Sequence, residues 1–325
     1  MKMKALVAHD YGQPDTYEVV EADAPSPATG EILVRVVASA VNMADLRVAR
    51  GDLSQFVQLP LPHVLGADFA GTVTAVGDGV SRFAVGDEVF GYTTSAAMAA
   101  FGGPNSPTGT GSMAEYLTVR ADTPFVAHRP AGLSVQDAAA LATTGLTARA
   151  LALTADVQPG ERVLVVGATG AVGTALMTIL SSSGAQITAT AMPADADAIT
   201  ALGADHVIGF DPAEYPADVD VILNVALPGN SLDDLIATVK PGGRLFTIVP
   251  PPPNPEQIPR QDITVTYVAD ANADLGGMTE LAQLALDGGI RPVIAKVYTL
   301  DDAVQAYVDF VGEHPVGKLV VTVPQ

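Results

Sequence analysis

Cysteine is absent from this chain of 325 residues. Its absence excludes disulfide bonds, thiolate nucleophiles and every zinc site that uses a cysteine ligand. Histidine occurs only five times, and no two histidines have the spacing of metal ligands. We therefore expect no metal site, and we interpret the five histidines as turn or packing residues. They are His9, His63, His128, His206 and His314.

Basic residues are also scarce: 16 lysines and arginines stand against 36 aspartates and glutamates, a formal charge of −20. This charge repels phosphate backbones and anionic lipid surfaces over a Debye length of roughly 8 Å. No apolar run reaches the length of about 18 residues that a membrane span needs. We expect a small-molecule substrate and neither nucleic acid nor a membrane as partner.

The first residues, MKMKALVAHD, run into His9, Asp10 and then Gly12 before a signal-peptide apolar region could form. The sequence therefore favours a cytoplasmic protein.

Residues 1–123 alternate short β-branched runs with glycine and proline, which predicts a β-rich domain of short strands. Strands are expected at 32–37, 71–76, 88–90 and 116–119. From about Phe125, alanine- and leucine-rich helical stretches alternate with strands, the pattern of parallel βαβ units.

The second pattern predicts a doubly wound α/β sheet. Its strands are expected at 162–166, 186–190, 206–208, 219–223 and 244–249, with crossover helices at 172–183, 194–202 and 231–239. Helices are also expected at 279–286 and 301–310. The terminal strand KLVVTV is best explained if the chain returns to the first domain. The expected boundaries are thus 1–123 with 290–325 for the β-rich domain and 124–289 for the inserted one.

The segment RVLVVGATGAVG, residues 162–173, leads from an apolar strand through glycines directly into a helix. In the dinucleotide motif GxGxxG, Ala168 takes the place of the first glycine. Gly170 allows a pyrophosphate to approach, and Gly173 allows close helix–strand packing. The free N–H groups of the helix N-terminus attract phosphates. The segment therefore predicts a nicotinamide dinucleotide cofactor.

Cofactor choice stays open on the residues alone. No lysine or arginine lies between Arg162 and Lys240, so the obvious clamp for a 2′-phosphate is missing. Asp195 lies beyond the usual position of a ribose-binding carboxylate, and we interpret it as a helix cap or first-turn acid.

The segment GADFAGTVTAVG at 66–77, followed by RFAVGDEV at 82–89, resembles the signature of the medium-chain dehydrogenase/reductase superfamily. Six further segments resemble the other landmarks of that superfamily in order. They are NMAD at 42–45, GSMAEY at 111–116, GLTA at 145–148, ATGAVG at 168–173, LGAD at 202–205 and GKLV at 317–320. The resemblance covers essentially the whole chain. It implies a GroES-like β domain with an inserted Rossmann domain, NADPH as cofactor and a homodimer.

Zinc-dependent members of the superfamily bind the metal through a Gly-His-Glu segment and an upstream cysteine. Here Ala67 replaces that histidine, Asn42 matches the cysteine, and the four-cysteine lobe for a structural zinc is missing. Alanine and an amide cannot hold zinc as imidazole and thiolate do. The resemblance therefore points to the zinc-free quinone oxidoreductase (zeta-crystallin-like) and enoyl reductase branch.

Within that branch, the position of Asn42 lies beside the nicotinamide ribose, where its amide could position the nicotinamide or the substrate; the alternative is a turn-forming asparagine. Asp45 belongs to the same motif or caps the following helix. Arg47 and Leu53 stand where related quinone reductases often present tyrosines. Arg47 could attract an anionic substrate or point to solvent. Tyr92 is a pocket candidate or a half-buried strand residue, and the proton donor is not identified.

The remaining cofactor positions follow from matching the family's turn and strand ends onto this sequence. They are Thr147, Ala168, Gly170, Ala171, Val172, Gly173, Thr190, Ala191, Asn224, Val225, Ala226, Ile248, Val249, Pro250 and Lys318. Lys318 could equally be a solvent-exposed lysine. Two loops, 93–111 and 250–259, follow strands and are either lids or ordinary surface loops.

These features together predict an NAD(P)H-dependent, zinc-independent oxidoreductase that transfers hydride to a quinone or a carbonyl-conjugated double bond. A tailoring enoyl reductase acting on an acyl or natural-product substrate is the alternative, and the non-aromatic Arg47 and Leu53 would suit it. An alternative of another class is a nucleotide-binding redox sensor or assembly partner without turnover.

Overall fold

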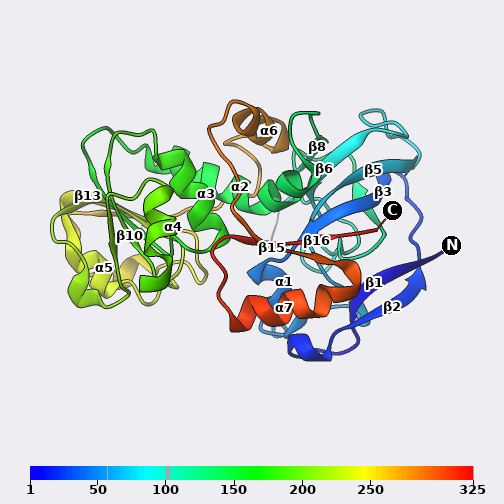
Figure 1. Cartoon of the computed structure of the whole chain (residues 1–325), viewed down its shortest axis with the longest axis horizontal. Helices are drawn as coiled ribbons and strands as arrows, with labels where there is room; N and C mark the ends of the chain where they lie inside the picture. Colours follow the sequence, from blue (N-terminus) through cyan, green and yellow to red (C-terminus); the bar gives the residue numbers. More distant parts are fainter. Residues whose placement is uncertain (57, 100–102, 325) are drawn as a thin grey trace. The chain divides into compact units, whose positions relative to one another are not determined.

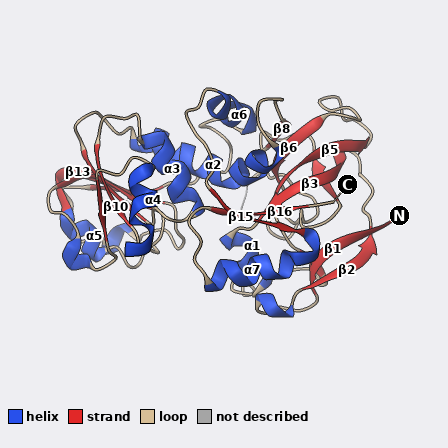
Figure 2. Ribbon diagram, viewed as in Figure 1, coloured by secondary structure: helices blue, strands red, loops and turns tan. Residues whose placement is uncertain are grey.

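The computed structural model describes residues 1–56, 58–99 and 103–324. The chain forms two compact units. The first comprises Met1–Thr143, Ala271–Asp287 and Ile294–Gln325, and the second comprises Thr144–Asp270 and Gly288–Val293. Figure 1 follows the chain through them, and Figure 2 marks their helices and strands. The domain boundaries expected from the sequence, at 123/124 and 289/290, stay a prediction.

The first unit is built on a seven-stranded sheet in the order β15-β16-β3-β5-β6-β8, with β7 paired to β3. Its strands are β3 (Glu31–Ala40), β5 (Asp68–Val76), β6 (Glu88–Tyr92), β7 (Tyr116–Arg120), β8 (Val126–His128), β15 (Ile294–Thr299) and β16 (Lys318–Thr322). Every second residue of β3, from Ile32 to Ala38, is buried, as expected for a strand with one face on the core. The C-terminal strand β16 pairs antiparallel with β3, so the chain does return to its first domain.

A second, three-stranded sheet in this unit was not predicted. It has the order β2-β1-β4, with β1 (Lys2–Ala8), β2 (Glu18–Asp23) and β4 (His63–Val64). Helices α1 (Met43–Ala49), α6 (Met278–Leu286) and α7 (Ala303–Gly312) also belong to this unit. Tyr307 of α7 is fully buried, and its ring meets Tyr17 edge-on at 6.0 Å between centroids.

The second unit holds a six-stranded parallel sheet in the order β11-β10-β9-β12-β13-β14. Its strands are β9 (Arg162–Val166), β10 (Gln186–Thr190), β11 (His206–Ile208), β12 (Val219–Asn224), β13 (Val239–Thr247) and β14 (Thr264–Tyr267). The crossover helices are α3 (Ala171–Leu180), α4 (Ala196–Ala201) and α5 (Asp233–Thr238). Numbered within the unit, the strand order is 3-2-1-4-5-6, which is the doubly wound order of dinucleotide-binding sheets. The predicted fold class is confirmed.

Helix α2 (Val135–Ala155) runs through the junction between the units at Thr143 and Thr144. Among the described residues it is the one helix whose length and composition would allow a membrane span. Of its most apolar stretch of 18 residues, 61% is buried within the protein, as in the core helix of a soluble protein.

Candidate functional site

The turn between β9 and α3 lies at the carboxyl edge of the parallel sheet, where ligands bind in this architecture. Gly167 makes the turn with φ of +93°, a conformation that disfavours side chains, and an added Cβ would lie 2.8 Å from Cβ of Ala226. Sequence reasoning aligned Ala168 with the first glycine of the motif. Ala168 is buried, and Gly167 before it performs the turn, so Gly167 is a residue that the site prediction left out.

Gly170 and Gly173 have different reasons to be glycine. A Cβ on Gly173 would lie 2.1 Å from the carbonyl oxygen of Gly167, so helix α3 can pack on the turn only without a side chain there. A Cβ on Gly170, the residue before α3, would approach no atom closer than 3.6 Å. Protein packing therefore requires Gly173, whereas Gly170 leaves room for a ligand group at the N-terminus of a ten-residue helix.

Polar side chains at the strand ends fix the loops of this edge. Thr190, the last residue of β10, accepts a hydrogen bond from the Gly167 N–H at 2.9 Å through its Oγ1. Asn224, the last residue of β12, donates from Nδ2 to Thr247 Oγ1 at 2.8 Å, and its Oδ1 accepts from the Ala226 N–H at 3.2 Å. Thr190, Asn224 and Thr247 are all fully buried. Their side chains hold the turn and loop backbones in place.

The other predicted cofactor positions in this unit surround the same edge. Val166 of β9 pairs with Asn224 of β12, and β10 and β13 flank these two strands. The residues that follow the strand ends are Ala171 and Val172 at the start of α3, Ala191 after β10, Val225 and Ala226 after β12, and Ile248, Val249 and Pro250 after β13. Thr147 lies on α2 and is partly buried. A binding role for each of these residues stays a prediction.

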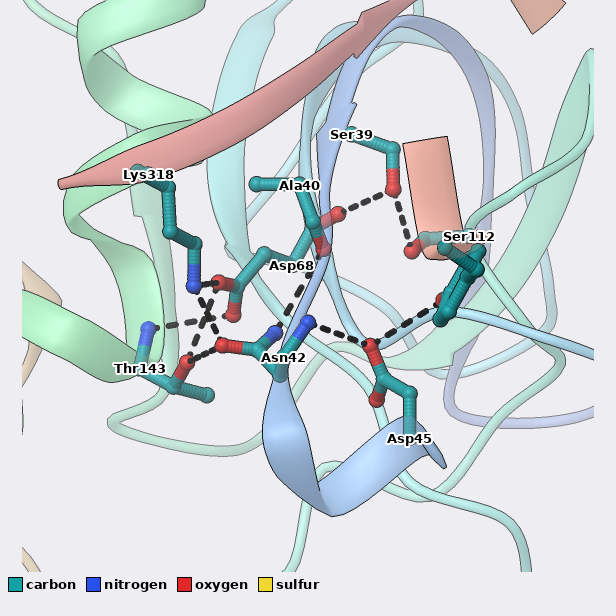
Figure 3. Close-up of polar contacts among 9 residues, drawn as sticks. Ser39, Ala40, Asn42, Asp45, Asp68, Ser112, Thr143 and Lys318 are labelled. Atoms are coloured by element: carbon teal, nitrogen blue, oxygen red, sulfur yellow. Dashed lines mark hydrogen bonds and ion pairs between the residues drawn. The ribbon is translucent and has the colours of Figure 1, made fainter. Parts of the chain in front are cut away.

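A second group of polar side chains lies in the first unit (Figure 3). Lys318, at the start of β16, has its side chain only 3% exposed, and its Nζ lies 3.0 Å from Oδ2 of Asp68, which is fully buried. The same ammonium donates to Oδ1 of Asn42. Lys318 is therefore not a solvent-exposed lysine but one half of a buried ion pair that also binds Asn42.

Thr143 of α2 joins this group. Its backbone N–H donates to Asp68 Oδ1 at 3.1 Å, and its Oγ1 lies 3.0 Å from Asp68 Oδ2 and 3.1 Å from Asn42 Oδ1. The single hydroxyl proton can serve one of these two acceptors at a time. We call Asn42, Asp68, Thr143 and Lys318 the buried polar cluster.

Asp45, the third residue of α1, borders the cluster. Its Oδ2 accepts from the Asn42 backbone N–H at 3.2 Å and from the Tyr307 hydroxyl at 3.4 Å. Burial, reinforced by the negative charge of Asp68, raises the pKa of Asp45 to about 7, against the opposing charge of Lys318. The contact with the Asn42 N–H is the helix-capping role expected as one alternative for Asp45, and the carboxyl group that makes it is about half protonated at pH 7.

The structure brings Asn42, Asp45 and Lys318 together, and it adds Asp68, Thr143 and Tyr307, which sequence reasoning did not include. The sequence held one signal for Asp68: it follows Ala67 in the signature segment. A buried lysine requires a counter-charge of this kind.

The other pocket candidates are placed as follows. Arg47 on α1 and Leu53 after it are partly buried, and the Tyr92 ring packs against Phe125 at 5.1 Å between centroids. Their assignment to a substrate pocket stays a prediction.

The residues at the position of the superfamily's catalytic zinc do not fit a metal ion. Ala67 offers no ligand atom, and the Asn42 oxygen already accepts from the Lys318 ammonium, whose positive charge would repel zinc. Among the residues that the structure describes, no group of three or more histidine, cysteine, aspartate or glutamate side chains could hold a metal.

Two family models match the chain: an alcohol dehydrogenase GroES-like domain over residues 28–130 and a zinc-binding dehydrogenase domain over residues 202–321. Together with the doubly wound sheet, these matches decide the family. The chain belongs to the medium-chain dehydrogenase/reductase superfamily. Its first unit is the GroES-like domain, its second unit is the Rossmann domain, and the protein is an NAD(P)-dependent oxidoreductase.

Its relatives within the superfamily include a quinone oxidoreductase of Mus musculus, 28% identical over 341 residues that cover 98% of this chain and 97% of the mouse protein. The spectinabilin polyketide synthase system protein NorB of Streptomyces orinoci is 32% identical over 320 residues. That match covers 94% of this chain but only 14% of NorB. Among solved structures, mycobacterial Rv1454c complexed with NADPH has a TM-score of 0.82 and 25% identity, covering 98% of this chain and 99% of that one.

Proposed function

We propose that this protein is a zinc-independent, NADPH-dependent reductase that transfers hydride to a quinone or to a carbonyl-conjugated double bond. The observation that carries the proposal is the buried polar cluster: at the position where zinc-dependent relatives hold a metal ion, Asn42 binds the Lys318 ammonium. A reaction of this class needs no metal, because bound NADPH would supply the hydride.

The chain's own residues would bind the cofactor and orient the nicotinamide and the substrate. The N–H groups at the start of α3 would hold the pyrophosphate beside Gly170, where no protein atom fills the space of a side chain. Gly167 and Thr190 would keep that turn in place through their hydrogen bond. Asn42 would position the nicotinamide or the substrate, since its side chain is held rigid from within the first unit.

NADPH is proposed over NADH because a solved relative is complexed with NADPH. The segment between Arg162 and Lys240 contains no basic residue, so recognition of a 2′-phosphate would have to use backbone N–H groups and neutral side chains. NADH is the competing cofactor.

A second candidate function is reduction of an activated double bond in an acyl or natural-product substrate. It is supported by the 32% identity to a polyketide synthase system protein, of which this chain spans 14% of the length. Arg47 and Leu53 also replace the aromatic side chains that would stack on a flat quinone. A quinone and an enoyl thioester therefore belong in the same substrate panel.

The proposal is tested by following NADPH oxidation with protein dialysed against EDTA. A panel of 1,4-quinones, enones and enoyl thioesters would be assayed with and without added zinc. The proposed function predicts turnover of at least one substrate at 1 s⁻¹ or faster, on the order of ordinary enzymes, and unchanged by zinc. Turnover only after zinc addition would contradict it, and cofactor binding without any turnover would favour a redox sensor. We also propose a homodimer in the cytoplasm, and light scattering at micromolar concentration that detects only monomer would contradict the dimer.

A further inference from the structure

The burial of Lys318 requires an explanation that the fold alone does not give. Lysine is among the residue types least often found fully buried, and removing an ammonium from water costs several kcal/mol unless partners compensate for the loss. Here the compensation comes from Asp68, itself completely buried, and from the carboxamide oxygen of Asn42. The chain thus keeps one positive charge in direct contact with the residue proposed to orient the ligand.

The contact with Lys318 settles which way the Asn42 carboxamide is turned. An ammonium group only donates hydrogen bonds, so the Asn42 atom that faces it must be the oxygen. The amide nitrogen then lies on the opposite side, where it reaches the Ala40 carbonyl oxygen at 3.5 Å, the outer limit of a hydrogen bond. Without Lys318 the carboxamide would keep this weak contact and the Thr143 hydroxyl, which can accept as well as donate and so does not fix which way the amide is turned.

Figure 3 shows that the partners of Asn42 come from three separate elements: Lys318 from β16, Thr143 from α2, and Asp45 from α1. Thr143 contacts both Asp68 and Asn42, so it links the ion pair to the carboxamide a second time. Asp45 accepts from the Asn42 backbone N–H and so does not compete for the side-chain oxygen. The side-chain oxygen is therefore left to Lys318 and Thr143.

We propose that Lys318 is a positioning residue: its ammonium, anchored on Asp68, fixes the Asn42 carboxamide with Oδ1 turned toward the buried ion pair and Nδ2 turned away from it. The inference rests on the proposed function, in which Asn42 orients the nicotinamide or the substrate. Lys318 then affects hydride transfer only through Asn42. Residues that orient a ligand-binding side chain in this way typically account for about 10- to 100-fold in affinity or activity.

The test is a double-mutant cycle on kcat/KM with the variants Lys318→Met, Asn42→Ala and the two combined. If Lys318 acts through Asn42, each single variant loses about 10- to 100-fold, and the double variant is no worse than Asn42→Ala alone. Lys318→Arg, which keeps a cation and donors at this position, is expected to recover part of the loss. Losses that multiply in the double variant, or a Lys318→Met enzyme within twofold of wild type, would overturn the inference.

A matched control comes from a second lysine–aspartate pair in the same unit. Lys296 of β15 binds Asp309 of α7 at 2.6 Å, and neither belongs to the candidate site. Lys296→Met removes a lysine–aspartate pair outside the candidate site whose lysine is half exposed, so its kcat/KM should stay within about twofold of wild type. Circular dichroism of every variant at the assay temperature corrects for any unfolded fraction.

Failure of the proposed function would be recognised separately. If the wild-type protein reduces no member of the substrate panel, the proposed function is wrong, and the same cycle is measured on the dissociation constant of NADPH. Coupled losses of NADPH affinity in the single variants would still support Lys318 as a positioning residue. Independent losses, or unchanged affinity in Lys318→Met, would overturn that role.

Discussion

Replacing Lys318 by methionine should strongly destabilise the GroES-like domain, because it leaves the Asp68 carboxylate buried without its counter-charge. Removing one partner of a buried ion pair typically costs about 3–5 kcal/mol. Asp68 keeps the two contacts from Thr143, at 3.1 and 3.0 Å, so we expect the lower end, about 3 kcal/mol. With a urea m-value of about 2–3 kcal/mol/M, the unfolding midpoint should fall by about 1–1.5 M.

The double variant Asp68→Asn/Lys318→Met separates loss of charge pairing from loss of packing. An asparagine oxygen can still accept from Thr143, and no buried charge remains, so its stability should return to within about 1.5 kcal/mol of wild type. The chain contains no tryptophan, so urea unfolding is followed by far-ultraviolet circular dichroism. The midpoint of each transition is compared, since a protein of two domains need not unfold in a single step.

Two results would refute this reasoning. A Lys318→Met midpoint equal to that of the wild type would mean that Asp68 is not charged and buried as the contacts indicate. A double variant as unstable as Lys318→Met would mean that the lysine side chain stabilises by packing rather than by pairing.

Three further predictions concern other parts of the chain. Gly173→Ala should destabilise the Rossmann domain by several kcal/mol, since its Cβ would lie 2.1 Å from a backbone oxygen. Gly170→Ala should fold normally yet lose cofactor affinity at least about tenfold. Equal affinity of Gly170→Ala and wild type in a fluorescence titration would contradict the proposed pyrophosphate position beside Gly170. Protonation of the buried Asp45 carboxyl, whose pKa is raised to about 7, contributes stability that is complete below pH 4 and is lost as pH rises through 7. Only about two pH units of that range lie above pH 5, so Asp45→Asn should remove up to about 2.5 kcal/mol of the decrease in unfolding free energy from pH 5 to pH 8, checked by urea midpoints at both values. Hydrogen bonds from Lys296, Tyr298 and Gln305 lower the pKa of Asp309 to about 2. The ionised carboxylate therefore contributes to the free energy of unfolding above pH 4, and this contribution is lost as pH falls through 2. Asp309→Asn should lose stability less steeply in acid than the wild type, and an equally steep loss would contradict this prediction.

The Rossmann sheet was predictable because its strands are short buried runs bounded by turn residues. Strands β9, β10 and β11 begin and end at the predicted residues. Strand β13 begins at Val239 rather than at 244, since it continues through Pro241 and the glycines after it with an irregular register against β12. Proline and glycine are disfavoured in strands, so the predicted strand began after them, and in the folded chain tertiary pairing prevails.

The buried polar cluster was only partly predictable. Family motifs pointed to Asn42, Asp45 and Lys318 one by one, but their meeting depends on β16 pairing with β3, a contact across more than 270 residues. Nothing in the spacing of Asp68 and Thr143 indicates that a helix residue would donate to a strand carboxylate 75 positions away. The small sheet β2-β1-β4 was missed although β1 has a buried run at Ala5–Ala8, because its partners β2 and β4 contain no buried residue and give no strand signal.

The measurement that tests the central claim most directly is a titration of EDTA-dialysed protein with NADPH and, separately, NADH, following nicotinamide fluorescence. Our account predicts saturable NADPH binding in the micromolar range, tighter than NADH binding, and without any requirement for zinc. Binding of neither nucleotide, or binding restored only by added zinc, would contradict it.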